Sequence, residues 1–288
     1  MSDTAASLQR KIASAAELES VVRTMKAMAA SSIGQYEKAV RSLDEYYRTV
    51  QLGLCACFRQ DTQGEAPETA ATGAVVFGSD QGLVGQFNEQ ILGFVEAQLQ
   101  NLPGKKTVWA VGNRIQSRLC DTDLQQGVSF ILPNSITAIT PLIGQLLLEI
   151  ESQLANGGIT QFYLFHNRPE KGAIYQPVSQ RLLPLDAVWR KDLTALYWPS
   201  NNLPQVLNDP EQTRGSFVRE YLFVSLFRAC AESLSSENAS RLAAMQRAEK
   251  NIDELLEDLQ RNFHRLRQNN IDAELFDVVS GFEAFNAP

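Results

Sequence analysis

The stretch between Gly215 and Gly281 contains neither glycine nor proline, so no residue in it interrupts a helix. Just before it, Asp209 can accept hydrogen bonds from the first amides of a helix, Pro210 suits the first helical position and Gln212 can complete a capping box. These residues predict one helix that begins near Asp209. A helix of about 70 residues would be about 105 Å long. That length exceeds the width of a globular domain, so we expect the helix to protrude.

Apolar residues recur every three or four positions along this predicted helix, which indicates that it packs against another helix. Two polar residues, Asn238 and Arg241, interrupt the pattern. A polar break can fix the register of paired helices, or it can mark a contact with another protein, and the sequence slightly favours the first interpretation. The predicted seam consists of Val224, Phe227, Ala231, Leu234, Met245, Ala248, Ile252, Leu255, Leu259 and Leu266.

A second long helix is predicted from about Thr4 to Phe58, where only Gly34 and Gly53 interrupt good helix formers. Two long helices at opposite ends of the chain would bury each other's seams as an antiparallel coiled coil, because the residues between them must return the chain. The alternative is separate helical arms that dimerise with other chains. The second seam is Leu18, Val22, Met25, Ala29, Ser32, Tyr36, Ala39, Leu43, Tyr46 and Val50.

The residues between the two helices alternate between strand and helix patterns, which predicts a Rossmann-like α/β domain with a mainly parallel sheet. The last two strands can instead form a hairpin. We predict a helix over 1–59, a polar linker over 60–72, the α/β domain over 73–208 and the second helix over 209–288. The strand candidates are 74–77, 107–111, 128–132, 159–166 and 174–183, and the helix candidates are 88–99, from 113 onward, and 135–154.

The glycine-rich turn from Gly78 to Gly85 follows the first strand and precedes a helix, as a phosphate-binding loop would. Its spacing matches neither dinucleotide-binding nor P-loop patterns, and it contains no lysine. A tight structural turn is therefore the preferred interpretation. The two histidines, His166 and His264, have no metal-ligand or nucleophile partner at a useful spacing. The sequence predicts no catalytic residues and no metal site.

The formal net charge of -7 argues against a nucleic-acid partner. Only residues 1–59 are net basic, with 8 Lys and Arg against 6 Asp and Glu. The chain has no apolar run long enough to span a membrane and no secretory signal pattern. The four cysteines lack zinc-type spacing, so reduced packing thiols in a cytoplasmic protein are expected.

Three separated motifs resemble those of the gamma subunit of F-type ATP synthases. The first comprises Lys11-Ile12-Ala13-Ser14 and Thr24-Met25-Lys26-Ala27-Met28-Ala29-Ala30-Ser31. The second is the turn Gly78-Ser79-Asp80-Gln81-Gly82-Leu83-Val84-Gly85-Gln86-Phe87-Asn88. The third is Glu237-Asn238-Ala239-Ser240-Arg241-Leu242-Ala243-Ala244-Met245. They occur in the family's order, and the resemblance extends over essentially the whole chain.

The resemblance implies the central rotor stalk of a bacterial-type complex, which couples ion flow through the membrane c-ring to ATP synthesis or hydrolysis on a ring of alpha and beta subunits. It implies those subunits, the epsilon subunit and the c-ring as partners. It also implies a peripheral position on the cytoplasmic face of the bacterial inner membrane. No cofactor is expected on this chain, because Mg-ATP and Mg-ADP would bind to the partner subunits.

The resemblance further implies which residues contact the ring. These are Arg23, Met25, Lys26, Ser79, Asp80, Gln81, Arg241, Met245, Arg267 and Gln268.

The chain also departs from the family pattern. Ser20, Gln81, Val84 and Phe87 differ from the family's usual residues, which indicates a divergent member or a subunit of an alternative complex. Two other hypotheses are a coiled-coil adaptor with a non-catalytic α/β domain and a nucleotide-binding α/β enzyme.

Overall fold

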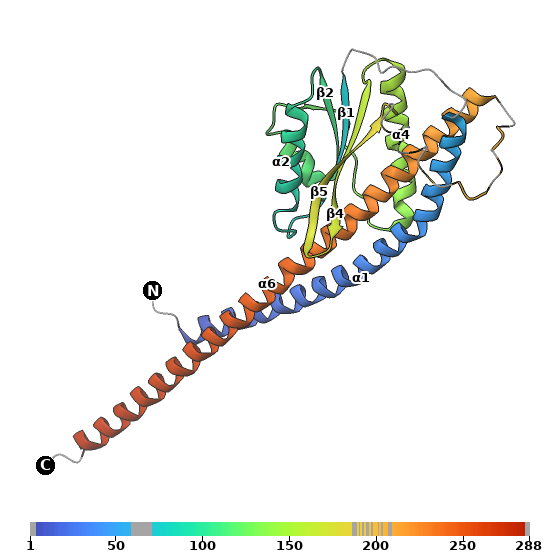
Figure 1. Ribbon diagram of the computed structural model, residues 1–288. Coiled ribbons are helices and arrows are strands. Elements are labelled where there is room, and N and C mark those ends of the chain that lie inside the picture. The colour runs from blue at the N-terminus through green and yellow to red at the C-terminus, as the bar shows by residue number, and fades with distance from the viewer. Residues whose placement is uncertain are drawn as a thin grey trace. The chain divides into compact units, whose positions relative to one another are not determined.

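A computed structural model describes residues 4–58, 71–185, 189, 191, 193, 196, 198–200, 202, 204–206 and 209–285 (Figure 1). The chain divides into two compact units, which are treated separately below. The helical unit comprises Met1–Ala29 and Leu242–Pro288, and the α/β unit comprises Ala30–Arg241. The predicted linker lies outside the described residues as far as residue 70.

Two long helices contribute segments to both units. Helix α1 spans Ala5–Phe58 and helix α6 spans Pro210–Phe285. The amide of Glu211 donates to Oδ1 of Asp209 at 3.3 Å, so the predicted N-terminal cap of the second long helix is confirmed.

The two helices run antiparallel in each unit. In the helical unit, Lys26 of α1 bonds to Glu249 of α6. In the α/β unit, Asp44 pairs with Arg228, and a Cβ on Gly53 would lie 2.3 Å from the ring of Phe217. The predicted antiparallel pairing is confirmed.

The predicted seam of α1 is buried or half-buried except at Leu18 and Tyr46. Leu18 and Tyr46 are 57% and 45% exposed, whereas Glu19, Lys26 and Tyr47 are half-buried. Lys26 reaches Glu249 across the helix pair, so a polar side chain also takes part in the seam. The buried and half-buried residues along the seam are Leu8, Ile12, Ala15, Glu19, Val22, Met25, Lys26 and Ala29 in the helical unit, and Ser32, Ile33, Tyr36, Ala39, Val40, Leu43, Tyr47, Val50 and Leu54 in the α/β unit.

The seam of α6 is shifted in the helical unit. Leu255 is 49% exposed, while Leu256 and Phe263 are half-buried.

The α/β unit is built on a five-stranded sheet of order β3-β2-β1-β4-β5. All neighbouring strands are parallel except β4 and β5, which form an antiparallel hairpin. The strands are β1 (Thr72–Phe77), β2 (Lys106–Val111), β3 (Gln125–Gln126), β4 (Gln161–Glu170) and β5 (Ala173–Leu183). The predicted α/β fold with a mainly parallel sheet is confirmed.

Helices cover both faces of this sheet, because side chains alternate between the faces along each buried strand. Ala74 and Val76 of β1 pack against α2 (Phe87–Gln100) and α3 (Asn113–Leu119). Val75 and Phe77 pack into a larger core with α4 (Ile139–Ala155), which follows the short helix η1 (Ile136–Ala138). Segments of α1 and α6 complete that second core. Figure 1 shows the sheet between α2 and α4.

The predicted strand over 128–132 is wrong. Only Phe130 bridges to β2, at Val111, and the two-residue strand β3 lies earlier. A Cβ on Gly127 would lie 2.5 Å from Nε1 of Trp109. The indole of Trp109 thus packs directly against Gly127, and in the segment after it only Phe130 keeps the pairing with β2.

Helix α6 is buried on all sides at residues 229–237. Such burial requires packing partners around the whole helix, and here the core joins it to α1, α4 and the sheet. Several of these buried residues are polar, including Glu232, Ser233, Ser235, Ser236 and Glu237.

Candidate functional site

The first group of predicted contact residues lies on α1 in the helical unit. Arg23 is an exposed side chain that bonds to Glu19 and lies 3.9 Å from Glu249. The ammonium of Lys26 lies 2.5 Å from the second oxygen of Glu249. Glu249 thus neutralises part of this basic surface and holds Lys26 toward α6, while Met25 beside it is half-buried.

The second group lies in the turn between β1 and α2. The side chain of Ser79 is buried: its amide donates to Oδ1 of Asn88 at 3.0 Å, and its hydroxyl accepts from Nδ2 of Asn88 at 2.8 Å. Asp80 accepts from the backbone amides of Asn113, at 2.8 Å, and Leu132, at 3.2 Å. Ser79 and Asp80 therefore tie the turn to α2, to α3 and to the segment after β3.

The outer part of the same turn is anchored to α6. The hydroxyl of Ser240 donates to the carbonyl oxygen of Val84 at 2.6 Å. Leu83 has a φ of 62° and is 61% exposed, and Gln81 is also exposed. The turn thus presents Gln81 and Leu83 at the surface while its inner residues hold the fold together, as the structural interpretation of the turn predicted.

The predicted polar break in α6 forms a compact cluster. The guanidinium of Arg241 donates to Glu237 at 2.5 Å and to Oδ1 of Asn238 at 3.3 Å. Burial raises the pKa of Glu237 above its ordinary value, and the charge of Arg241 partly offsets that rise. These residues line a cavity of about 180 Å³ that also touches Tyr36 and Asp80. Arg241 is therefore held against its own helix.

The remaining predicted contacts lie on α6 in the helical unit. Met245 is buried, at 3% exposure, whereas Arg267 and Gln268 are exposed. Beyond them a run of apolar side chains is also exposed, comprising Ile271, Leu275, Phe276, Val278 and Val279.

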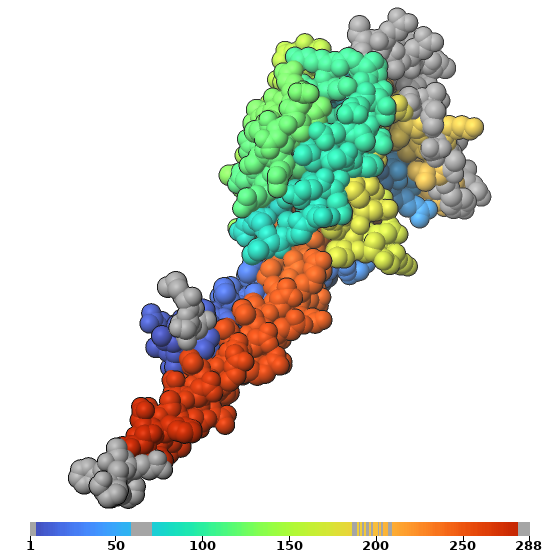
Figure 2. Space-filling view, turned by 90° about the vertical axis from the view of Figure 1, so that its left-hand side faces the viewer, coloured from blue at the N-terminus to red at the C-terminus, as the bar shows by residue number. Residues whose placement is uncertain are grey.

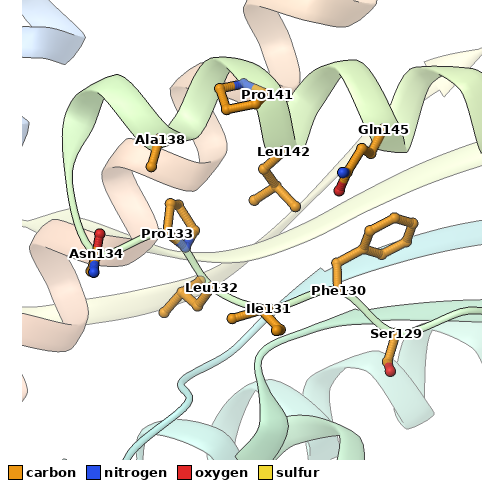
Figure 3. A pocket seen from close by; sticks show the side chains of 10 residues that line it. All are labelled: Ser129, Phe130, Ile131, Leu132, Pro133, Asn134, Ala138, Pro141, Leu142 and Gln145. Atoms are coloured by element: carbon orange, nitrogen blue, oxygen red, sulfur yellow. The ribbon is translucent and has the colours of Figure 1, made fainter.

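A separate groove of about 520 Å³ lies between the segment 129–134 and α4. Leu142 and Gln145 of α4 point toward Phe130 across it (Figure 3). Ile131, in the same segment, is 73% exposed. No ionisable residue lines the groove, so it does not have the composition of an acid–base or metal site.

No helix in the described part of the chain is both long and apolar enough to cross a membrane. Within the same residues, His, Cys, Asp and Glu form no group of three or more that could hold a metal ion.

Comparison with known proteins assigns these features to a family. A family model described as ATP synthase matches residues 4–285, which include both long helices and the α/β domain. The chain belongs to the ATP synthase gamma-chain family.

Curated gamma chains align with this member of the family over almost their whole length. The ATP synthase gamma chain of Polynucleobacter asymbioticus is 24% identical over 294 residues, covering 96% of this chain and 98% of the relative. That of Moorella thermoacetica is 25% identical over 287 residues, covering 96% and 97%. The gamma-subunit prediction is confirmed.

Solved structures share the fold. In the mitochondrial ATP synthase of Euglena gracilis, a chain of the assembly described as OSCP/F1/c-ring matches with a TM-score of 0.68 and 16% identity, covering 96% of this chain and 93% of that one. A chain of the central stalk and c-ring assembly of Tetrahymena thermophila matches with a TM-score of 0.57 and 24% identity, covering 79% and 99%. The central-stalk role follows from the family, and a gamma chain is a non-catalytic subunit of its membrane-associated complex.

One group of polar residues in this gamma chain was missed by sequence reasoning. His166 is buried, and its Nε2 lies 2.8 Å from Glu232. Arg168 and Arg228 bond to the same carboxylate. The only sequence signal was the placement of His166 and Arg168 two residues apart on one strand, which puts them on one face. Their partner lies 64 residues or more further along the chain, where no local pattern points to it.

Proposed function

We propose that this gamma chain is the rotating shaft of a bacterial-type F-type ATP synthase. In this proposal the paired helices enter a ring of alternating alpha and beta subunits, and the α/β domain contacts the epsilon subunit and the c-ring. The observation that carries it is the family match over residues 4–285, which covers both long helices. The relatives' gamma-chain names and the stalk assemblies of the structural neighbours support the same partners.

The mechanism is differential contact between an asymmetric shaft and the catalytic subunits. Ion flow through the c-ring turns the shaft, and each angle favours a different set of beta-subunit conformations with different nucleotide affinities. A ligand or partner shifts such an equilibrium only by its difference in interaction free energy between the states. ATP hydrolysis runs the same coupling in reverse.

The exposed members of the predicted contact set serve as direct contacts in this proposal. Arg23, Gln81, Arg267 and Gln268 present polar atoms to ring loops, and Lys26 does so from its pair with Glu249. Exposed charge pairs contribute about 0–1 kcal/mol each, so these contacts direct rotation rather than provide tight binding. The half-buried Met25 adds an apolar contact. The buried or internally bonded residues Ser79, Asp80, Met245 and Arg241 then act by shaping the surface around the contacts.

The chain itself carries out no bond chemistry in this proposal. It binds no nucleotide, metal or nucleic acid, and Mg-ATP and Mg-ADP remain on the ring. The absence of a phosphate-loop spacing in the turn and its internal hydrogen bonds through Ser79 and Asp80 support that assignment. The chain is held peripherally at the cytoplasmic face of the membrane through the complex.

Co-expression with alpha and beta subunits from the same organism tests the proposal. We expect a stable ATP-hydrolysing complex that contains one copy of this chain. A chain that remains a soluble homodimer beside the ring subunits would support the adaptor alternative. Saturable nucleotide binding by the isolated chain would support the enzyme alternative.

A further inference from the structure

Glu232 of α6 is a buried carboxylate that receives three donors. Its side chain is 6% exposed. One oxygen accepts from Nε2 of His166 at 2.8 Å and from Nε of Arg168 at 2.9 Å. The other accepts from Nε of Arg228 at 2.8 Å. A carboxylate with two guanidinium donors is among the strongest hydrogen-bonded arrangements in proteins.

The donors come from different elements of the α/β unit. His166 and Arg168 project from one face of β4, just beyond Phe165, the last residue of β4 that pairs with β1. Figures 1 and 2 show the β4–β5 hairpin lying beside α6 there. Arg228 lies on α6 and also pairs with Asp44 of α1 at 3.2 Å. One carboxylate thus connects the sheet to α6, and through Arg228 to α1.

The charges in this cluster balance. Burial would raise the pKa of Glu232, but the hydrogen bond from His166 and the charges and hydrogen bonds of its other partners lower it to about 2. Burial lowers the pKa of His166 despite the opposing effect of Glu232, so His166 is neutral at pH 7 and donates through Nε2. Glu232 and Asp44 then offset Arg168 and Arg228.

Other contacts between the sheet layer and α6 are weaker or less directional. Ser240 makes one hydrogen bond to the carbonyl of Val84, and Gln180 reaches Tyr221 at 3.3 Å. Arg219 of α6 also pairs with Glu151 of α4 at 2.9 Å, but both side chains are exposed and their attraction is screened by solvent. Apolar packing adds to these contacts. Apolar burial resists separation of two surfaces but is not directional, whereas charge-assisted hydrogen bonds fix geometry.

We propose that Glu232 is the positioning residue through which the α/β domain transmits torque to the long helices. This inference rests on the proposed function, in which rotation enters through the α/β domain and leaves along α1 and α6. The Glu232 cluster forms the junction between the sheet and α6. When the ring and this chain are detached from the membrane, no external torque crosses this junction. Loosening it therefore affects ion-driven synthesis and leaves hydrolysis by the detached assembly unchanged.

The test uses the complete complex in liposomes with Glu232→Gln. We expect hydrolysis by the detached assembly to stay within about twofold of wild type and ion-driven ATP synthesis to fall about tenfold, since charged bonds are replaced by neutral ones. Glu89→Gln is the matched control, because it breaks the surface pair of Glu89 and Arg118 without touching the junction. His166→Gln keeps a donor toward Glu232, and we expect wild-type synthesis.

Arg168→Met covers the case in which Glu232→Gln does not assemble. It removes one partly exposed donor, and a fall in synthesis of about threefold with unchanged hydrolysis is expected. Wild-type synthesis in assembled Glu232→Gln or Arg168→Met, or equal losses of synthesis and hydrolysis in them, would overturn the inference. A wild-type chain that forms no active complex would instead contradict the proposed function.

Discussion

Lys26 illustrates how a polar side chain takes part in a helix seam. Its long aliphatic stem can pack against α6 while the ammonium reaches Glu249. The heptad interpretation assigned Met25 to the seam, because apolar character was the only criterion. Eight of the ten predicted seam residues of α1 are buried or half-buried, and Leu18 and Tyr46 are exposed. Lys26 was not predicted to lie in the seam, because the pairing of a lysine with a distant glutamate leaves no local pattern.

Substitution of Met25 tests the contact role of this surface. We expect Met25→Lys to reduce ATP synthesis more than assembly, because a third cation beside Arg23 and Lys26 changes the surface presented to the ring. Met28→Lys is the matched control, since Met28 is 66% exposed. Assembly and both activities are measured in the purified complex. Equal loss of assembly and synthesis in Met25→Lys would count against the role assigned to Met25.

His166 makes the stability of the chain depend on pH. The pKa of His166 is lowered from its ordinary value of 6.5 by burial. Below about pH 6.5 the unfolded chain therefore binds a proton that the native chain does not, and stability falls as the pH decreases. The change for one proton is at most about 1.4 kcal/mol per pH unit.

Urea unfolding of the full chain between pH 7.5 and 5 measures this dependence. We expect His166→Gln to flatten the slope below pH 6.5. The exposed His264 provides the control, and His264→Gln should keep the wild-type slope. An unchanged slope in His166→Gln would show that the dependence arises elsewhere.

At the scale of elements, alanine substitution of two glycines should change the stability of the chain in opposite directions. Gly112, before α3, has a φ of 118°, and a Cβ there would lie 2.8 Å from the carbonyl oxygen of Ser79. We expect Gly112→Ala to destabilise the chain by about 1–3 kcal/mol. Gly144 lies within α4, and a Cβ there would meet nothing within 4 Å. Gly144→Ala should stabilise by about 0.5–1 kcal/mol, because glycine is unfavourable inside helices.

Thermal or urea unfolding of the two variants decides between these expectations. A stabilised Gly112→Ala would mean that the turn after β2 relaxes without cost. A destabilised Gly144→Ala would mean that α4 packs more tightly than the structure indicates.

The elements differed in how well the sequence predicted them. The strands at residues 74–77 and 107–111 were predicted nearly to their ends, because buried parallel strands read as continuous apolar runs bounded by turns. The same criterion failed at residues 128–132, where Trp109 fills the space beside Gly127. The segment is apolar because it lines a groove with α4, and apolar character alone does not distinguish these two situations.

At the scale of the whole molecule, the motifs predicted the family and the antiparallel helices. Capping residues, heptad spacing and three ordered motifs are all local features that a sequence displays directly. The cluster at Glu232 was not predicted, because it brings together residues from α1, β4 and α6. The individual ring contacts stay predictions, and so does the placement in a divergent or alternative complex.

The central claim is that this chain rotates within the ring, and Cys120 offers a direct measurement. Cys120 is exposed, whereas Cys55, Cys57 and Cys230 are buried, so a thiol-reactive probe can be attached at one site on the α/β unit. The labelled chain is assembled with immobilised alpha and beta subunits, and the probe is observed while ATP is hydrolysed. We predict stepwise rotation in one direction that stops when ATP is removed. Hydrolysis at the normal rate with a probe that does not turn relative to the ring would contradict the account.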